Sequence, residues 1–318
     1  MRTERIRETE GYLNECASAR ENRRTMKKRT VCLIAALLVL FAAVLPAGAE
    51  TIVICDVTAD TADTSICFET NLRYRVAELT AGLDRMPNLQ KVDMYGSRME
   101  TEDMDMLRER YPQVEFGFTV YMGRHVFRSD ITAFSTLVGG DDDPIYYSDA
   151  FEMLRFCPNL QALDVGHNMI TTLDFLRHFP HMKILILGKN RITDISELAN
   201  LQELEYLELF SNAFSDLTPL AGLENLKDLN IAACREVTDL TPLIEGVPNL
   251  ERFWCGQNEK ITVEQRAAME AAHPDCEFNW VDHPTGGTWR RHPRYIILHH
   301  MFLTRIYEPF DQSEETEE

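Results

Sequence analysis

One segment of the chain, residues 160–261, repeats itself, and this repeat constrains the fold more than any other feature. It holds five copies of the pattern L-x-x-L-x-L-x-x-N-x-I, which begin at Leu160, Met182, Leu204, Leu226 and Leu250. Successive copies are separated by 22, 22, 22 and 24 residues. A fixed period of this length is typical of a solenoid, in which each repeat supplies one supersecondary unit.

The alternating L-x-L part of each copy predicts a short strand with one buried face. A single copy cannot bury that face alone, so neighbouring copies must stack and pair their strands in parallel. The asparagine of each copy then turns the chain out of the strand, and its amide can bond backbone groups that the bend leaves unpaired. We expect this structural ladder at Asn168, Asn190, Asn212 and Asn258, with Cys234 in the fourth position.

This pattern resembles the leucine-rich repeat family. The resemblance implies an α/β solenoid with a curved parallel sheet, a convex side of short 3₁₀ or helical pieces, and α/β caps. The span from about Phe68 to Phe310 further resembles leucine-rich repeat proteins exported by Firmicutes-type gut bacteria, whereas internalin-type surface proteins are similar only in the repeat. The LPxTG sorting signal of such surface proteins is missing, which argues against covalent attachment to a cell wall.

The chain as a whole divides into six predicted segments. They are a disordered extension at 1–25, a signal peptide or signal anchor at 26–49, an N-terminal cap with an outlying repeat at 50–150, the solenoid at 151–272, a C-terminal cap at 273–310 and an acidic tail at 311–318. Two of these segments share an order of elements, because residues 89–120 and 250–281 each predict a repeat strand, a helix and a closing strand. In the C-terminal cap, residues 295–298 are predicted as a strand.

Residues 26–49 have the three parts of a signal peptide: basic residues 27–29, an apolar run at 31–45, and Ala47-Gly48-Ala49 as a cleavage site. Fifteen apolar residues are fewer than the roughly 20 that span a bilayer as a helix. We therefore expect cleavage after Ala49, with Met26 as the true start. The alternative is an uncleaved single-pass anchor that holds residues 31–45 in the membrane. Either way the repeats are extracytoplasmic, secreted or on the cell surface.

The charge of the chain is strongly acidic. The formal net charge is −19, and because residues 1–49 carry nine basic and five acidic residues, the remainder carries 23 and 46, a net −23. A balance of this kind repels nucleic acid. Export would also permit disulfides, and a bridge between Cys55 and Cys67 is a hypothesis, whereas Cys234 and Cys255 are expected to be packed thiols.

Motifs that carry chemistry are few. The triplet at 141–143 lacks the alternating spacing of a calcium loop, and the histidines His292, His299 and His300 lack ligands at zinc-like spacing. We therefore predict no catalytic residues, no metal and no cofactor. Two alternatives to a binding protein remain: a hydrolase whose catalytic groups lie in the C-terminal cap around His292–His300, and a structural component of the cell envelope.

The outward positions of the strands predict a binding surface. In stacked parallel strands these positions line one concave face, and on this face several large side chains are expected to be exposed. Tyrosine and tryptophan are favoured anchors of protein interfaces. The sequence thus predicts a protein or peptide partner bound by Ile184, Ile186, Tyr206, Glu208, Phe210, Asp228, Arg252 and Trp254.

The export hypothesis predicts a particular N-terminus. Cleavage after Ala49 leaves Glu50 as the first residue, so N-terminal sequencing of the protein recovered from outside the expressing cell is expected to begin there. A sequence that began at Met1 would rule out cleavage, and the membrane fraction would then contain the anchored form.

Overall fold

The computed structural model describes residues 49–68, 74–137, 145–286 and 288–310. The predicted extension, the apolar run at 31–45, the acidic triplet at 141–143 and the tail at 311–318 lie outside these residues. The chain divides into two compact units, residues 1–50 and 51–318, and the elements below belong to the second. Within the described ranges, no helix is both long enough and apolar enough to cross a membrane.

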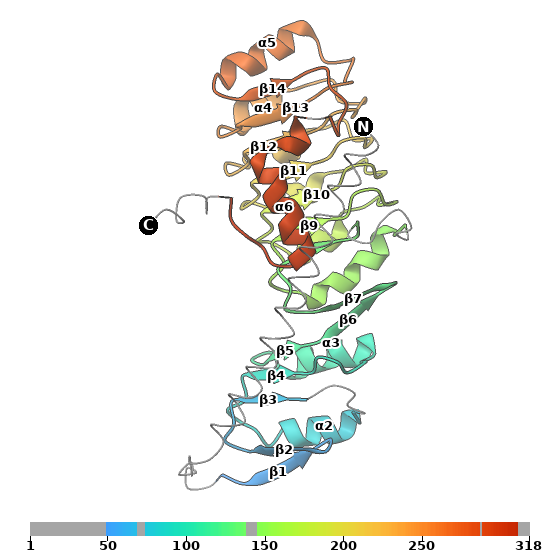
Figure 1. The fold of residues 1–318 in the computed structure, drawn as a ribbon, viewed down its shortest axis with the longest axis vertical. Coiled ribbons are helices and arrows are strands. Elements are labelled where there is room, and N and C mark those ends of the chain that lie inside the picture. The colour runs from blue at the N-terminus through green and yellow to red at the C-terminus, as the bar shows by residue number, and fades with distance from the viewer. Residues whose placement is uncertain (1–48, 69–73, 138–144, 287, 311–318) are drawn as a thin grey trace, which may run out of the picture. The chain divides into compact units, whose positions relative to one another are not determined.

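Seven parallel strands form the main sheet, with the spatial order β14-β13-β12-β11-β10-β9-β8 (Figure 1). Each strand is three residues long: β8 (Ala133–Ser135), β9 (Ala162–Asp164), β10 (Ile184–Ile186), β11 (Tyr206–Glu208), β12 (Asp228–Asn230), β13 (Arg252–Trp254) and β14 (Glu277–Asn279). Each of the five central strands is centred on the first apolar residue of an L-x-L part, and each pairs with its neighbour at the same consensus position, as Ile184 does with Ala162 and Tyr206. The prediction of one parallel strand per copy is confirmed. The sheet also extends past both ends of the predicted solenoid, because β8 and β14 pair in the same register without the full consensus.

The side of the repeats opposite the concave face consists of short elements. They are η1 (Ser148–Phe156), η2 (Asp174–His178), η3 (Ser196–Asn200), η4 (Thr218–Leu220) and α4 (Thr241–Gly246), and all but α4 are 3₁₀ helices. Their leucines meet the inward residues of the strands, such as Leu185 and Leu207, which are fully buried. One hydrophobic core therefore runs from repeat to repeat, which is how a solenoid stabilises units that could not fold alone.

The turn after each central strand has a recurring backbone conformation. The residue before the ladder position adopts the left-handed conformation in all five copies: His167, Lys189, Ser211, Ala233 and Gln257, with φ between 55° and 61°. For a residue with a Cβ this conformation costs about 1–2 kcal/mol. Hydrogen bonds from the ladder side chains stabilise the turn against that cost.

Asn190 shows how a ladder side chain bonds two adjacent turns. Its Nδ2 donates to the carbonyl oxygens of Val165 at 3.0 Å and Leu187 at 2.9 Å, while its Oδ1 accepts from the backbone N–H of Ile170 at 3.0 Å. Asn212 makes the same three contacts one repeat further on. In the fourth copy the Cys234 thiol donates to the carbonyl oxygen of Leu209 at 3.2 Å, so the thiol replaces one of the amide's donors.

Ahead of the main sheet lie two antiparallel hairpins and a small parallel sheet. The elements are β1 (Thr51–Ile54), β2 (Val57–Asp60), β3 (Ser65–Cys67), α2 (Val76–Leu83), β4 (Lys91–Asp93), α3 (Thr101–Arg110), β5 (Glu115–Gly117), β6 (Thr119–Met122) and β7 (His125–Arg128). The order β4–α3–β5 matches β13–α5–β14, where α5 spans Val263–Ala272, and both closing strands pair in parallel with the repeat strand. The predicted order of strand, helix and closing strand is confirmed in both places.

Two predictions are wrong, one about the C-terminal cap and one about the N-terminal cap. Residues 295–298 are not a strand but belong to α6 (Pro293–Thr304), which follows η5 (Trp289–Arg291). Pro293 suits the first turn of a helix, and the His292 imidazole accepts a hydrogen bond from the Arg294 N–H. The Cys55–Cys67 bridge is also absent, because the Cys55 thiol is free and buried in the β1–β2 turn, whereas Cys67 ends a strand of another sheet.

The ladder yields a prediction about stability. Asn190→Ala leaves the buried Ile170 N–H without its acceptor and removes one of the two side-chain donors of the Val165 and Leu187 carbonyls, so we expect the free energy of unfolding in urea to fall by about 1–3 kcal/mol. Asn200→Ala is the matched control, since Asn200 is exposed and bonds only Glu197, at 3.5 Å. Equal losses in the two variants would show that the ladder contributes nothing specific.

Candidate functional site

The concave face of the sheet is covered by the chain itself. Figure 1 shows α6 crossing in front of β9–β11, and its buried residues pack against the outward side chains of those strands. The expectation that this face is exposed is therefore wrong: Tyr206, Glu208, Asp228 and Trp254 have no exposed surface, and Ile186, at 7%, is the most exposed of the eight predicted binding residues. The other three, Ile184, Phe210 and Arg252, are equally buried.

Apolar side chains of the concave sheet face and of residues 289–310, here called the covering segment, form a second hydrophobic cluster. This cluster is separate from the core between the repeats. The sheet contributes Ala133, Ala162, Ile184, Ile186, Tyr206 and Trp254, and the covering segment contributes Trp289, Leu298, Met301, Phe302 and Phe310. Trp289 lies at its centre, with its ring centroid 5.6 Å from that of Tyr206 and 5.1 Å from that of Trp254. A fully buried aromatic anchor of this kind is typical of an interface hot spot.

Glu208 is a buried carboxyl at the middle of the concave face. Its Oε1 accepts two hydrogen bonds, from the Tyr206 hydroxyl at 2.5 Å and from the Trp289 indole N–H at 2.9 Å. Its Oε2 is buried and has no hydrogen-bond partner. Burial raises the pKa of Glu208, while the nearby Arg290 charge and the two donors oppose that rise.

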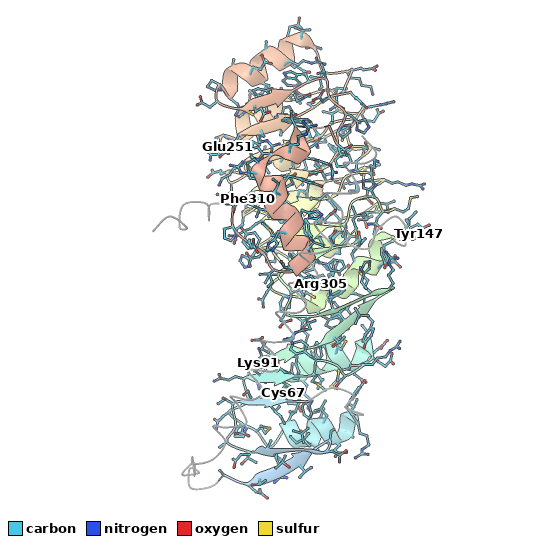
Figure 2. The ribbon with its side chains drawn as sticks, in the orientation of Figure 1. Cys67, Lys91, Tyr147, Glu251, Arg305 and Phe310 are labelled. Atoms are coloured by element: carbon cyan, nitrogen blue, oxygen red, sulfur yellow. The ribbon has the colours of Figure 1, made fainter. Side chains whose placement is uncertain are left out.

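Asp228 anchors the N-terminal turn of α6 by charge. Its two carboxylate oxygens accept from Nη1 of Arg252 at 3.1 Å and from Nη1 of Arg294 at 2.9 Å. Arg294 also pairs with Glu251, and Arg252 donates to the Trp289 carbonyl oxygen at 3.3 Å. A buried charge without a partner is destabilising. The covering segment therefore stabilises the buried charges of Asp228 and Arg252 by supplying hydrogen-bond partners for both. Figure 2 labels Glu251 beside this network.

The far end of α6 is held at the first strand of the sheet. Arg305, which ends the helix in the left-handed conformation (Figure 2), accepts at its carbonyl oxygen from the N–H groups of Thr132 and Ala133, at 3.2 and 3.3 Å. The Tyr307 N–H then donates to the Thr132 hydroxyl at 2.7 Å. The covering segment is thus fixed at both ends, by ion pairs at one and by backbone hydrogen bonds at the other.

A cavity of about 380 Å³ remains between α6 and the sheet. Its lining consists of Ser135, Leu137, Asp164, His167, Ile186, Glu208, Phe210, Arg290, Tyr295, Leu298, His299, Phe302 and Leu303. Asp164 accepts from the Ser135 hydroxyl at 3.0 Å and from the Gly166 N–H at 3.1 Å. Burial raises the pKa of Asp164 to about 6, with the Gly166 N–H opposing the rise. Two buried carboxyls therefore share one cavity.

The three histidines of the C-terminal cap do not act together. His292 caps α6, His300 pairs with Glu308 at 2.8 Å, and of the three only His299 lines the cavity. The Ser135 hydroxyl donates to Asp164, and no hydrogen bond joins it to a histidine in the described chain. The thiols of the solenoid are also unreactive, since burial raises the pKa of Cys157 and Cys234 to about 12 and that of Cys255 to about 11. Among the described residues, no three His, Cys, Asp or Glu side chains are grouped so as to hold a metal ion.

Sequence reasoning missed the residues that cover the face. Trp289, Arg290 and Arg294 lie in a segment that was predicted as a loop and a strand. One available signal was the spacing of Leu298, Met301 and Phe302, which places three apolar side chains on one face of a helix. A second signal was the presence of two charged residues, Asp228 and Arg252, at outward positions of neighbouring strands. Charged side chains on a sheet face that becomes buried require partners from another segment.

Comparison with known proteins supports the class of fold. Residues 158–200 match the family model described as "Leucine Rich repeats (2 copies)". Among solved structures, an internalin (inlF) of Listeria monocytogenes is similar at 25% identity and a TM-score of 0.40, over 50% of this chain and 46% of that one. Internalin C2 of the same organism gives 25% identity and 0.34, over 46% and 69%, and a Leptospira interrogans leucine-rich repeat protein gives 17% and 0.35, over 63% and 57%. No curated protein matches.

The chain spans a little under half of the length of the internalin that it resembles. The matched repeats, the five in-register central strands and the short elements on the opposite side define the fold as an α/β leucine-rich repeat solenoid. Its concave face is occupied by a helix of the same chain.

The buried carboxyl of Asp164 predicts a dependence of stability on pH. Its folded pKa of about 6 lies above the unfolded value of about 3.9, so its contribution is fully present below pH 4 and is lost as the pH rises through 6. Asn can keep both contacts without the charge, because its Oδ1 accepts from the Gly166 N–H and its NH₂ group donates to the Ser135 hydroxyl oxygen instead of accepting from it. Relative to the native chain, Asp164→Asn is therefore expected to gain stability between about pH 5 and pH 8, by up to about 3 kcal/mol.

The measurement is urea unfolding of both chains at a series of pH values. Comparing the two chains cancels the contributions of other titrating groups, such as His125, His167 and His292, whose pKa values burial lowers. Asp174→Asn, at an exposed position, serves as the control. A difference between native and Asp164→Asn that stays constant with pH would contradict the assignment.

Proposed function

We propose that this protein is a non-catalytic protein-interaction module whose concave sheet face binds an amphipathic helix presented by a partner. The observation that supports this is the occupancy of that face by α6. The outward side chains of the strands, which the sequence singled out as a binding surface, form a complete helix-binding site for a segment of their own chain. We further propose that the module is exported, on the basis of the pattern at 26–49.

The contacts with α6 are of the kinds that proteins use to bind helices. Leu298, Met301 and Phe302 follow the i, i+3, i+4 spacing by which a helix lays its apolar face into a groove. Trp289 provides a deep aromatic anchor, and the pairing of Arg294 with Asp228 sets the direction of the helix. A partner with the same three features would fit the same face, and the acidic balance of the chain favours a basic residue at the position of Arg294.

For a partner to reach the face, α6 must leave it. The segment is tethered to the solenoid, so its effective concentration at the face is high, and a free peptide competes poorly with it. Because of this competition, the apparent affinity of a partner depends on how tightly α6 itself binds the face. A partner binds when its contacts exceed those of α6 or when the ends of α6 are released.

The test uses a fluorescent peptide of residues 288–310 and the full chain with Trp289→Ala and Arg294→Glu. These changes weaken the chain's own α6, so the peptide is expected to bind the variant at least about ten-fold more tightly than the native chain, as measured by fluorescence anisotropy. Arg291→Glu in the chain is the matched control, because Arg291 is exposed. A peptide with the same two changes controls for non-specific binding.

Circular dichroism of the double variant shows whether the solenoid is still folded. A folded variant that binds neither peptide, or both equally, would contradict the proposal that the concave face recognises a helix. Saturable binding of the native peptide alone supports it.

A further inference from the structure

The cavity under α6 contains two polar atoms of opposite kind that lack partners. Oε2 of Glu208 is a buried acceptor without a donor, although the other oxygen of the same carboxyl accepts two hydrogen bonds. Nε of Arg290 is a buried donor without an acceptor. Native proteins leave few buried polar atoms unpaired, since each costs about 1–3 kcal/mol. Both residues line the same cavity, so a polar occupant would lie beside one unpaired acceptor and one unpaired donor of the described chain.

The charges of the cavity are also incompletely paired. Arg290 acts on Glu208 and Asp164 through space, lowering the pKa of each against the effect of burial. No ion pair within 4.0 Å joins its guanidinium to either carboxyl among the described residues, and Arg290 instead donates to the Tyr295 hydroxyl. The guanidinium and the two carboxyls are therefore close enough to interact and too far apart to bond directly.

Much of the remaining lining is apolar, although Ser135, His167, Tyr295 and His299 also contribute to it. Phe210 and Ile186 come from the sheet side, and Leu298, Phe302 and Leu303 come from α6. A cavity of about 380 Å³ falls in the usual range for small-molecule sites, roughly 300–1,000 Å³. Such sites combine a mostly apolar wall with a few polar groups that orient the ligand.

We propose that this cavity binds a small zwitterion with an apolar body, of the α-amino acid class. Its ammonium group donates to Oε2 of Glu208 and lies beside Asp164, and its carboxylate accepts from Nε of Arg290. Its side chain packs among Phe210, Leu298 and Phe302. A molecule with only one of the two charges would leave either the acceptor or the donor unpaired. This inference does not require α6 to leave the sheet, and so it is independent of the proposed function.

The experiment is calorimetric titration of the full chain at neutral pH with L-phenylalanine, L-leucine and L-methionine. Phenethylamine, which lacks the carboxylate, and 3-phenylpropanoate, which lacks the amine, are the comparators. We expect saturable one-to-one binding of at least one amino acid. Each singly charged analogue is expected to bind about ten-fold or more weakly, because each charge-assisted hydrogen bond contributes about 1.5–3 kcal/mol.

Glu208→Gln separates the binding role of this carboxyl from its structural role. Both native hydrogen bonds fall on Oε1, so the amide oxygen of Gln can accept them, while its NH₂ group replaces the free acceptor with a donor. We expect this variant to remain folded, as judged by circular dichroism, and to bind the amino acid about ten-fold or more weakly. Glu203→Gln, at an exposed glutamate that pairs with His181, is the matched control.

Arg290→Gln is expected to remove the preference for phenylalanine over phenethylamine, whereas Arg291→Gln leaves it intact. The proposal is overturned if none of the three amino acids binds at millimolar concentration, which would mean that water alone occupies the cavity. It is also overturned if phenethylamine binds as tightly as phenylalanine, or if folded Glu208→Gln binds as tightly as the native chain.

Discussion

Parallel pairing of three-residue strands is the interaction on which the rest of the molecule depends. Each strand is too short to be stable alone, and each gains its partners only when the next repeat is in register, as Leu185 is between Leu163 and Leu207. The asparagine ladder then connects successive turns, because a side chain such as Asn190 bonds a carbonyl and an N–H of the preceding repeat. Register, curvature and the position of every outward side chain follow from this stacking.

A stacked sheet has two faces, and in this protein both are buried. The inner face is covered by the short elements of the same repeats, whereas the concave face is covered by a single helix from far along the chain. The two covers differ in chemistry. Leucine and isoleucine dominate the first, but the second contains Glu208, Asp228 and Arg252, each of which bonds a residue of the covering segment. A polar interface with a tryptophan at its centre resembles a binding site more than a core.

How much of this was predictable depends on the distance between the groups that interact. The strands, the ladder positions and the short elements recur every 22–24 residues, so local pattern predicted them. The left-handed residue before each ladder position was not predictable, since His167, Lys189, Ser211, Ala233 and Gln257 share no side-chain property. The exposure of Tyr206 and Trp254 was predicted wrongly, because their cover lies outside the repeat and was interpreted as a strand.

The sequence by itself determined the solenoid, because a periodic pattern of leucines has one economical way to bury them all. It also determined which side chains line the concave face, since alternation along a strand sets their direction. Only the tertiary structure decided what that face contacts. Trp289 and Glu208, which form a hydrogen bond, are 81 residues apart in the sequence. No local pattern predicts this contact or the cavity beside it, because both arise only when α6 packs on the sheet.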